Sequence, residues 1–142
     1  MADSNLLARI PHRPPFLWVD AILSETENRI ETEKYISHEL PLFAGHYPDY
    51  PLLPGVILCE AAFQTGALLL SKNKDRQAAE IVKIPVVTRI LKAKFKREVH
   101  PGDTIKVQVK LLEKVGPAWF LQGKVLVREK VALSLEFACA FK

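Results

Sequence analysis

The pattern of apolar and polar positions predicts strands toward both ends of the chain and one long helix between them. Residues 16–23 (FLWVDAIL) are rich in aromatic and branched side chains, and residues 29–37 roughly alternate apolar with polar positions. Both patterns are typical of strands. The polar stretch SETEN between them predicts a turn.

The helix is predicted at residues 56–71 (VILCEAAFQTGALLLS) by its length and its content of alanine and leucine. The residues of this helix are apolar on almost every face, so we expect most of its faces to be buried. Residues 40–54 lead into it and carry Pro48, Pro51 and Pro54 at every third position. This spacing favours a stiff extended path with few hydrogen bonds of its own. The leucines between the prolines disfavour an exposed proline-rich ligand.

After a polar break at residues 72–77, the pattern is almost entirely strand. Residues 81–99 are long enough for one bent strand or two, and Pro85 marks a weak or edge position. Three more strands, separated by turns at PGD and GP, are predicted at residues 104–115, 118–129 and 130–141. An apolar helix needs a sheet wrapped around it. We therefore predict an α+β fold over residues 1–142, one domain with an antiparallel sheet around a long central helix. Its surplus apolar surface predicts a homo-oligomer.

Composition is that of an ordinary soluble domain, since 49% of the 142 residues are hydrophobic and 25% are charged. The N-terminus is a poor signal peptide. The longest apolar-rich run, residues 56–70, is interrupted by Glu60 and Gln64 and is shorter than the roughly 20 residues that span a bilayer. We expect a cytoplasmic protein with no membrane partner. Cys59 and Cys139 lack metal-ligand spacing, so we expect two free, buried thiols, with no base beside Cys59 to make it catalytic.

The candidate chemistry begins with Glu60, the single acidic residue of the predicted helix. Burying a lone carboxylate is costly, so Glu60 should be paired or kept protonated, and such a carboxyl group is a functional candidate. A structural glutamate that caps a loop or bridges to a lysine is the alternative. Gln64 lies one helical turn further on. It either orients Glu60 through a hydrogen bond or is a satisfied polar group of the core.

Two further features lie before and at the start of the helix. His46, between Gly45 and Tyr47, carries an imidazole that is a natural base near neutral pH, although a loop histidine is more often structural or exposed. At Gly55 the helix start offers free N–H groups to a developing negative charge, and glycine lets a substrate carbonyl approach. Every helix has such an end, so this signal is weak alone. The other histidines have neighbours typical of strand ends and turns, and we interpret them as structural or exposed: His12, His38 and His100.

Taken together, these residues resemble a known family. Residues 45–56 follow the pattern Gly-His-Tyr-Pro-x-x-Pro-x-x-Pro-Gly-Val, and residues 60–64 follow Glu-Ala-x-x-Gln. This combination is similar to the signature of 3-hydroxyacyl-[acyl-carrier-protein] dehydratases of bacterial fatty-acid synthesis. Residues 10–17 (IPHRPPFL) with residues 19–20 resemble the family's N-terminal strand. Residues 95–103 match its turn in the pattern Phe-Lys-Arg-x-Val-x-Pro-Gly-Asp.

The resemblance implies a hot-dog fold, in which two subunits join edge to edge and His46 faces Glu60 of the partner subunit. It implies dehydration of a 3-hydroxyacyl thioester to the trans-2-enoyl thioester in fatty-acid or polyketide-like synthesis. His46 would be the base for the proton next to the thioester, and Glu60 the acid for the leaving hydroxyl. Gly55 and Val56 at the helix start would bind the thioester carbonyl, with Gln64 as an orienting residue. No metal or redox cofactor is implied.

Charge and resemblance together suggest the partners. The net charge is +4, and strand alternation predicts that Lys92, Lys94 and Lys96 project to one face. They are either a solvated edge that discourages aggregation or a docking patch for an acidic acyl carrier protein. No aromatic stacking surface accompanies them, so we do not expect a nucleic-acid partner. The resemblance implies a homodimer, and because the family also assembles dimers into hexamers, the oligomer stays open.

The chain departs from the family pattern at three places: Tyr47 where phenylalanine is common, the pair Ala62-Phe63, and residues 85–89. These departures leave the acyl chain length and the pathway open. Glu60, where the isomerising relatives carry aspartate, argues against a double-bond isomerase. Two alternative functions remain at this point, a hot-dog acyl thioesterase and a non-catalytic subunit that binds acyl thioesters.

Overall fold

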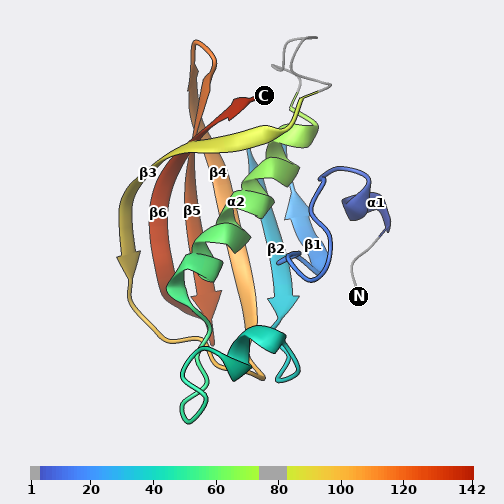
Figure 1. Cartoon of the computed structure of the whole chain (residues 1–142). Coiled ribbons are helices and arrows are strands. Elements are labelled where there is room, and N and C mark those ends of the chain that lie inside the picture. The colour runs from blue at the N-terminus through green and yellow to red at the C-terminus, as the bar shows by residue number, and fades with distance from the viewer. Residues whose placement is uncertain (1–3, 74–82) are drawn as a thin grey trace.

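The computed structural model describes residues 4–73 and 83–142, and these residues build a curved sheet with a long helix across its concave side (Figure 1). The elements in chain order are α1 (Ser4–Leu7), β1 (Ala21–Glu25), β2 (Arg29–Tyr35), the 3-10 helix η1 (Pro41–Ala44), α2 (Gly55–Ser71), β3 (Pro85–Phe95), β4 (Thr104–Val115), β5 (Ala118–Val127) and β6 (Lys130–Phe141). The predicted polar break and the start of the predicted strand at residues 81–99 extend outside the described residues.

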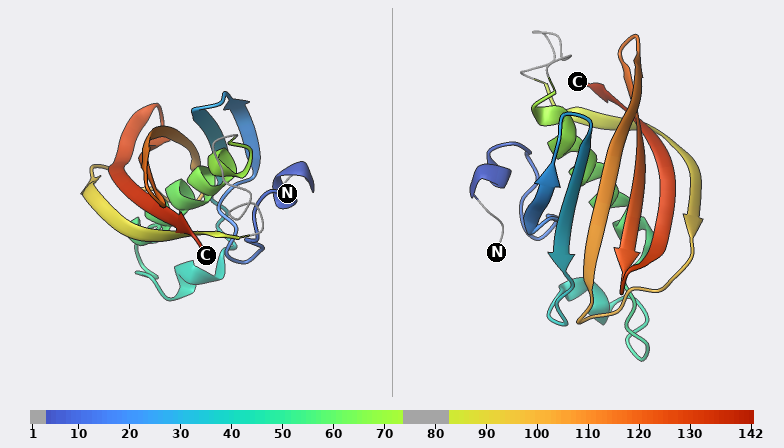
Figure 2. Two further views of the ribbon diagram at one scale, coloured as in Figure 1. Left: turned by 90° about the horizontal axis from the view of Figure 1, so that it is seen from above. Right: turned by 180° about the vertical axis from the view of Figure 1, so that it is seen from behind.

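The sheet is antiparallel throughout the described chain, with the strand order β1-β2-β4-β5-β6-β3. Alternate residues of β4 are buried at Ile105, Val107 and Val109. They form the inner face of the sheet, as the alternation of apolar and polar residues in this strand indicates. The view from above shows how the sheet curls around the helix (Figure 2). The predicted α+β fold with a sheet wrapped around one long helix is confirmed.

Helix α2 begins one residue earlier than predicted and is buried on most of its faces, as its apolar pattern indicated. Small residues allow it to lie close to the sheet. A Cβ at Gly66 would lie 2.9 Å from Cζ of Phe137, and a Cβ at Gly123 of β5 would lie 3.3 Å from Cβ of Ala62. The helix is therefore pressed onto β5 and β6. No helix in the described parts of the chain is long and apolar enough to cross a membrane.

The strand predicted at residues 16–23 is only partly present, since β1 begins at Ala21. The preceding residues 17–19 are buried but do not pair with another strand. The N–H of Trp18 donates instead to the side chain of Gln64 on the helix, at 2.7 Å. The aromatic and branched residues thus indicated burial correctly. The backbone N–H of Trp18, however, binds a side chain of the helix in place of a neighbouring strand.

The approach to the helix at residues 40–54 makes more local hydrogen bonds than predicted. It contains the 3-10 helix η1, with a proline at its first position, and a turn in which the N–H of Tyr50 donates to the carbonyl of Tyr47 at 2.9 Å. Tyr47 itself has a φ of 53°, a left-handed conformation that is unfavourable for a bulky residue. The segment is therefore a series of tight turns, and His46 lies immediately before the left-handed residue of one of them.

Strand β3 (Pro85–Phe95) is an edge strand, as Pro85 indicated. A β-bulge lies between Leu91 and Lys94, and Lys92 within it has a φ of 53°. The bulge breaks the two-residue alternation. Alternation alone therefore does not place Lys92 on the face of Lys94 and Lys96, although all three side chains are exposed and Nζ of Lys92 lies 3.3 Å from Oε2 of Glu136.

Candidate active site

Glu60 projects from the second turn of α2, with 23% of its side chain exposed. Gln64 lies one turn further on and is fully buried. Its Nε2 donates to Oε2 of Glu60 at 3.0 Å. Glu60 therefore has a hydrogen-bond partner, and the contact that an orienting Gln64 requires is present.

The orientation of the Gln64 amide follows from its other two hydrogen bonds. Its Oε1 accepts from the backbone N–H of Trp18 at 2.7 Å, and its Nε2 donates to the carbonyl of Phe16 at 2.8 Å. A backbone N–H can only donate and a carbonyl can only accept, so the two amide ends cannot be exchanged. Gln64 must therefore present an N–H to Glu60. The same side chain also ties α2 to the segment that precedes β1.

His12 is a neighbour of Glu60 that the sequence pattern did not reveal. Its Nε2 lies 3.8 Å from Oε2 of Glu60, and 26% of its side chain is exposed. Burial lowers the pKa of His12 below the ordinary 6.5, Glu60 raises it, and Arg13 lowers it. The ring is therefore neutral at neutral pH. Its Nδ1 is buried and has no hydrogen-bond partner within the described residues, which favours the tautomer that carries its proton on Nε2, toward Glu60.

The only sequence signal for His12 was its place in the stretch IPHRPPFL, which resembles the family's N-terminal strand. Its immediate neighbours indicate a turn, and no periodicity connects it to Glu60. Contacts between residues so far apart in the chain are formed by the tertiary fold, so the pattern of positions could not show this one.

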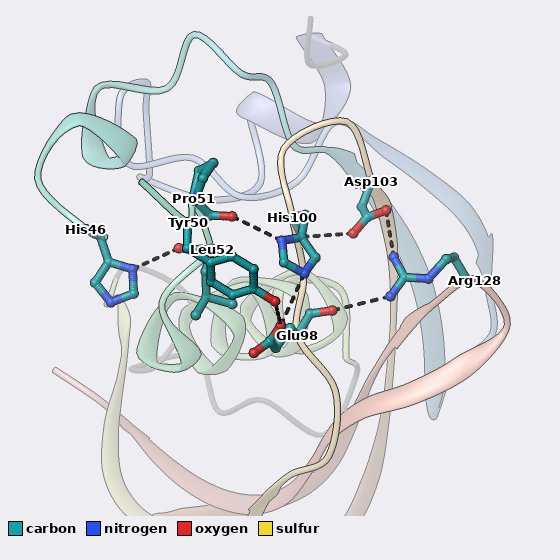
Figure 3. Close-up of polar contacts among 8 residues, drawn as sticks. All are labelled: His46, Tyr50, Pro51, Leu52, Glu98, His100, Asp103 and Arg128. Carbon is teal, nitrogen blue, oxygen red and sulfur yellow. Dashed lines mark hydrogen bonds and ion pairs between the residues drawn. The ribbon is translucent and has the colours of Figure 1, made fainter. Parts of the chain in front are cut away.

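His46 lies in the coil that follows η1, and its side chain is partly buried. Its Nδ1 lies 2.8 Å from the carbonyl oxygen of Leu52 (Figure 3). Because the carbonyl can only accept, Nδ1 is the protonated nitrogen. Its Nε2 has no hydrogen-bond partner within residues 4–73 and 83–142, so the neutral ring presents a free lone pair there.

His46 and Glu60 are not joined within one chain. Among the described residues, no hydrogen bond or ion pair connects the two side chains. The expected pairing between subunits stays a prediction, because it concerns a second chain.

The start of α2 has free backbone donors. The first hydrogen bond of the helix runs from the N–H of Ile57 to the carbonyl of Pro54, at 2.9 Å. The N–H groups of Gly55 and Val56 have no acceptor in the described part of the chain, and Val56 is 71% exposed. A Cβ at Gly55 would lie 2.8 Å from Cε1 of Phe95. A side chain at this position would have to displace the half-exposed ring of Phe95.

The two thiols are free and buried, as predicted. Burial raises the pKa of Cys139 to about 12 and also raises the pKa of Cys59, so neither is an activated nucleophile. Within residues 4–73 and 83–142, no three side chains of His, Cys, Asp or Glu are grouped to hold a metal ion.

Comparison with known proteins identifies the family of this chain. Residues 10–136 match the model of the FabA-like domain. The 3-hydroxyacyl-[acyl-carrier-protein] dehydratase FabZ of Petrotoga mobilis is 39% identical over 142 residues, which are 100% of this chain and 99% of that protein. The enzyme of the same name from Thermotoga petrophila is 42% identical over 123 residues, which cover 86% of this chain and 84% of that protein.

Solved structures share the fold at low sequence identity. The dehydratase heterocomplex ApeI:P from Xenorhabdus doucetiae superposes with a TM-score of 0.79 at 14% identity, covering 96% of this chain and 90% of that one. The PaaI protein of E. coli superposes with a TM-score of 0.64 at 12% identity, covering 84% and 80%. These structures confirm the predicted hot-dog fold. Together with its close relatives, the match over residues 10–136 shows that the chain belongs to the FabA-like family of 3-hydroxyacyl-[acyl-carrier-protein] dehydratases.

Proposed function

We infer that this protein is a hydro-lyase that converts a 3-hydroxyacyl thioester on acyl carrier protein to the enoyl thioester in fatty-acid synthesis. The observation that carries this conclusion is the match to named dehydratases along essentially the whole chain. The roles of individual residues and the oligomer, which follow, are our proposals.

We propose His46 as the base that removes the proton from the carbon next to the thioester. Its Nε2 is free, and its Nδ1–H is held by the carbonyl of Leu52. That hydrogen bond fixes the tautomer and also stabilises the imidazolium that forms when Nε2 takes up the proton. The C–H bond breaks, its electron pair forms the new double bond, and the proton stays on His46.

Glu60 is proposed as the acid for the leaving hydroxyl. Gln64 and His12 both approach its Oε2, which leaves Oε1 to carry the proton. That proton joins the hydroxyl group as the C–O bond breaks, and water departs. The carboxylate that remains on Glu60 keeps the hydrogen bond from Gln64 and needs no rearrangement of the site.

The free N–H groups of Gly55 and Val56 are proposed to bind the thioester carbonyl. Negative charge develops on that oxygen when the adjacent proton is removed. Backbone donors at a helix start are already oriented toward such a charge. One donor of this kind is commonly worth about 3 kcal/mol in the transition state.

We propose a homodimer that forms along the exposed edge of β3 and places His46 against Glu60 of the partner subunit. On its outer side, β3 pairs with no other strand of the described chain. Large apolar side chains at and beside this edge are at least 38% exposed: Ile84, Val86, Ile90 and Phe95. A long, exposed apolar edge strand promotes aggregation unless a second chain covers it.

The first test follows the hydration of a short enoyl thioester by loss of its absorbance. Turnover should collapse in both His46→Ala and Glu60→Gln, while circular dichroism shows that each variant keeps its fold. A thiol colour reagent in parallel distinguishes a thioesterase, which would release free thiol. Full turnover in either variant would remove that residue from the mechanism.

Co-expression of the two inactive variants tests the pairing between subunits. If each site takes His46 from one chain and Glu60 from the other, half of the randomly formed dimers contain one intact site. The mixture should then recover about a quarter of the wild-type activity. If both residues of a site come from the same chain, the mixture should stay as inactive as its components.

Lys94 and Lys96 are proposed to dock the acidic carrier protein by electrostatic attraction. Both are exposed at the end of β3, close in sequence to Phe95, whose ring packs on the helix start. Charge reversal of both lysines should raise KM for a carrier-bound substrate without raising KM for a short soluble thioester. Lys124→Glu, on the exposed part of β5, is the matched control. Equal effects on both substrates would contradict docking.

A further inference from the structure

The loop that follows His46 is held through two neighbouring carbonyl groups, each by an imidazole (Figure 3). The carbonyl of Leu52 accepts from Nδ1 of His46 at 2.8 Å. The carbonyl of Pro51 accepts from Nδ1 of His100 at 3.0 Å. The base therefore depends on a carbonyl whose neighbour is held by a second histidine.

The peptide group between Leu52 and Leu53 is held at both ends. Its carbonyl faces His46, and its N–H, on Leu53, donates to the carbonyl of Val99 at 2.8 Å. Because a peptide group is planar, a hydrogen bond at one end restrains the direction of the other. Val99 and His100 are consecutive, so one short segment fixes two successive peptide groups of the loop.

His100 is itself fixed by its neighbours. Its Nε2 lies 3.3 Å from Oε1 of Glu98, and the same oxygen accepts from the hydroxyl of Tyr50. Its backbone N–H donates to Oδ2 of Asp103 at 2.8 Å. Tyr50 belongs to the loop after His46, so the contacts run from that loop to the turn before β4 and back again.

The turn before β4 is also anchored by Arg128, which lies in the turn between β5 and β6. Nη1 of Arg128 donates to Oδ1 of Asp103 at 2.8 Å, and its Nη2 donates to the carbonyl of Glu98 at 3.5 Å. Burial raises the pKa of Asp103, but the His100 N–H and the Arg128 guanidinium outweigh it and hold that pKa below its ordinary value. Asp103 is thus a stable anion at neutral pH.

The family motif does not account for this arrangement. Tyr50 occupies an open position of the pattern at residues 45–56, and Glu98 and His100 occupy the two open positions of the pattern at residues 95–103. The three side chains nevertheless contact one another and the loop that the motif places next to the base.

We propose that Tyr50, Glu98 and His100 form a brace that positions His46. By fixing the Pro51 carbonyl, and with it the peptide groups that follow, the brace sets the direction of the Leu52 carbonyl and hence the tautomer and orientation of the His46 ring. The proposal rests on the proposed role of His46 as the base, and it makes the three residues positioning residues rather than catalytic ones.

The exposure of the brace side chains determines whether the brace affects folding stability or catalytic rate. The side chains of His100 and Glu98 are 35% and 51% exposed, so their contact is screened by water and contributes little to folding stability. Small displacements of a catalytic group, in contrast, lower rates strongly. The expected signature is a loss of kcat at nearly unchanged stability.

Steady-state kinetics on a short soluble enoyl thioester test the brace. In His100→Ala, kcat should fall about tenfold, with KM within about twofold of wild type because the helix start is untouched. His100→Asn should restore most of kcat, since its amide N–H reaches the position of Nδ1. Tyr50→Phe should show a smaller loss. His38→Ala, an exposed histidine near the same turn, is the control and should behave as wild type.

Nitrogen NMR of the His46 ring separates this proposal from the base assignment. In wild type, Nδ1 should be protonated and Nε2 free, and the two ring shifts should move toward each other in His100→Ala. If His46→Ala abolishes turnover while His100→Ala keeps both wild-type kcat and wild-type ring shifts, the brace is wrong and the base assignment stands. Turnover that survives His46→Ala would overturn the base assignment and the brace with it.

Discussion

Glu60 and His46 are held in opposite ways. Glu60 lies on a helix and is oriented by Gln64, a fully buried side chain whose hydrogen bonds are all satisfied. His46 lies in a coil of tight turns and is oriented by a backbone carbonyl, and the groups that fix this carbonyl are partly exposed. The group that orients the proposed acid is therefore part of the core, whereas the groups that orient the proposed base lie near the surface.

The difference separates stability from activity. Substitutions around Glu60 disturb buried hydrogen bonds, and leaving a buried polar group unsatisfied costs free energy of folding. Substitutions around His46 disturb solvent-screened contacts, which contribute little to folding. We therefore expect changes on the Glu60 side to lower stability and activity together, and changes on the His46 side to lower activity alone.

The largest effect should come from Gln64→Leu. The substitution leaves the buried N–H of Trp18 without its acceptor and removes the donor to Glu60. The free energy of unfolding should fall by about 3 kcal/mol, measured by urea denaturation, and kcat should fall with it. The matched control is Gln108→Leu, because Gln108 is exposed and makes its hydrogen bond to Glu31 on the surface; we expect a change below about 0.5 kcal/mol. Equal losses in the two variants would remove the contrast between core and surface.

The same contrast explains what the sequence could predict. The helix and the last three strands matched their predicted bounds to within two residues, because turns and alternation mark the strands and length with alanine and leucine content marks the helix. The Glu60–Gln64 contact was also predictable, since one helical turn separates the two residues. In a regular helix or strand, the spacing of residues along the chain determines which side chains are neighbours, and Glu60 lies in such a helix.

The His46 side was much less predictable. The proline spacing did not reveal the 3-10 helix or the turn at Tyr47, because these depend on local hydrogen bonds that several sequences can make. The contacts of His12 with Glu60 and of His100 with Pro51 join segments far apart in the chain. Both histidines were interpreted as structural or exposed, and only the tertiary fold showed what they touch.

An intermediate effect, dependent on pH, should come from His12. Burial, opposed by Glu60 and aided by Arg13, lowers its pKa below 6.5 in the folded chain. Above pH 6.5 both the folded and the unfolded states are neutral at this position. As the pH falls below 6.5, the unfolded chain takes up the proton first, and folding loses stability until the folded pKa is passed.

Wild type should therefore lose more stability between pH 7.5 and pH 5 than His12→Gln does, as measured by urea denaturation midpoints at both values. His38→Gln is the control, because His38 is exposed; it should follow wild type. If His12→Gln keeps the full pH dependence of wild type, then another group causes the loss of stability. His12 beside Glu60 would then be less buried than its lowered pKa indicates.

The smallest effect should come from Arg128, which anchors the turn that carries His100. This residue has a φ of 51°, in the left-handed region, and its guanidinium pairs with Asp103. Arg128→Ala removes the ion pair and keeps the backbone strain, so it should lose about 1 kcal/mol of unfolding free energy. Arg128→Gly removes the same ion pair but relieves the strain, so it should be the more stable of the two by about 0.5–1 kcal/mol.

Both variants lack the same contact to Asp103, so they should show the same small loss of kcat despite their different stabilities. Such a result would show that activity on the His46 side depends on the side-chain contacts that support the brace, whereas the difference in stability between the two variants comes from the backbone of the turn. If kcat instead followed stability across the two variants, the exposed contacts would be coupled to folding in the same way as the buried ones around Gln64, and the distinction between the two sides of the site would fail.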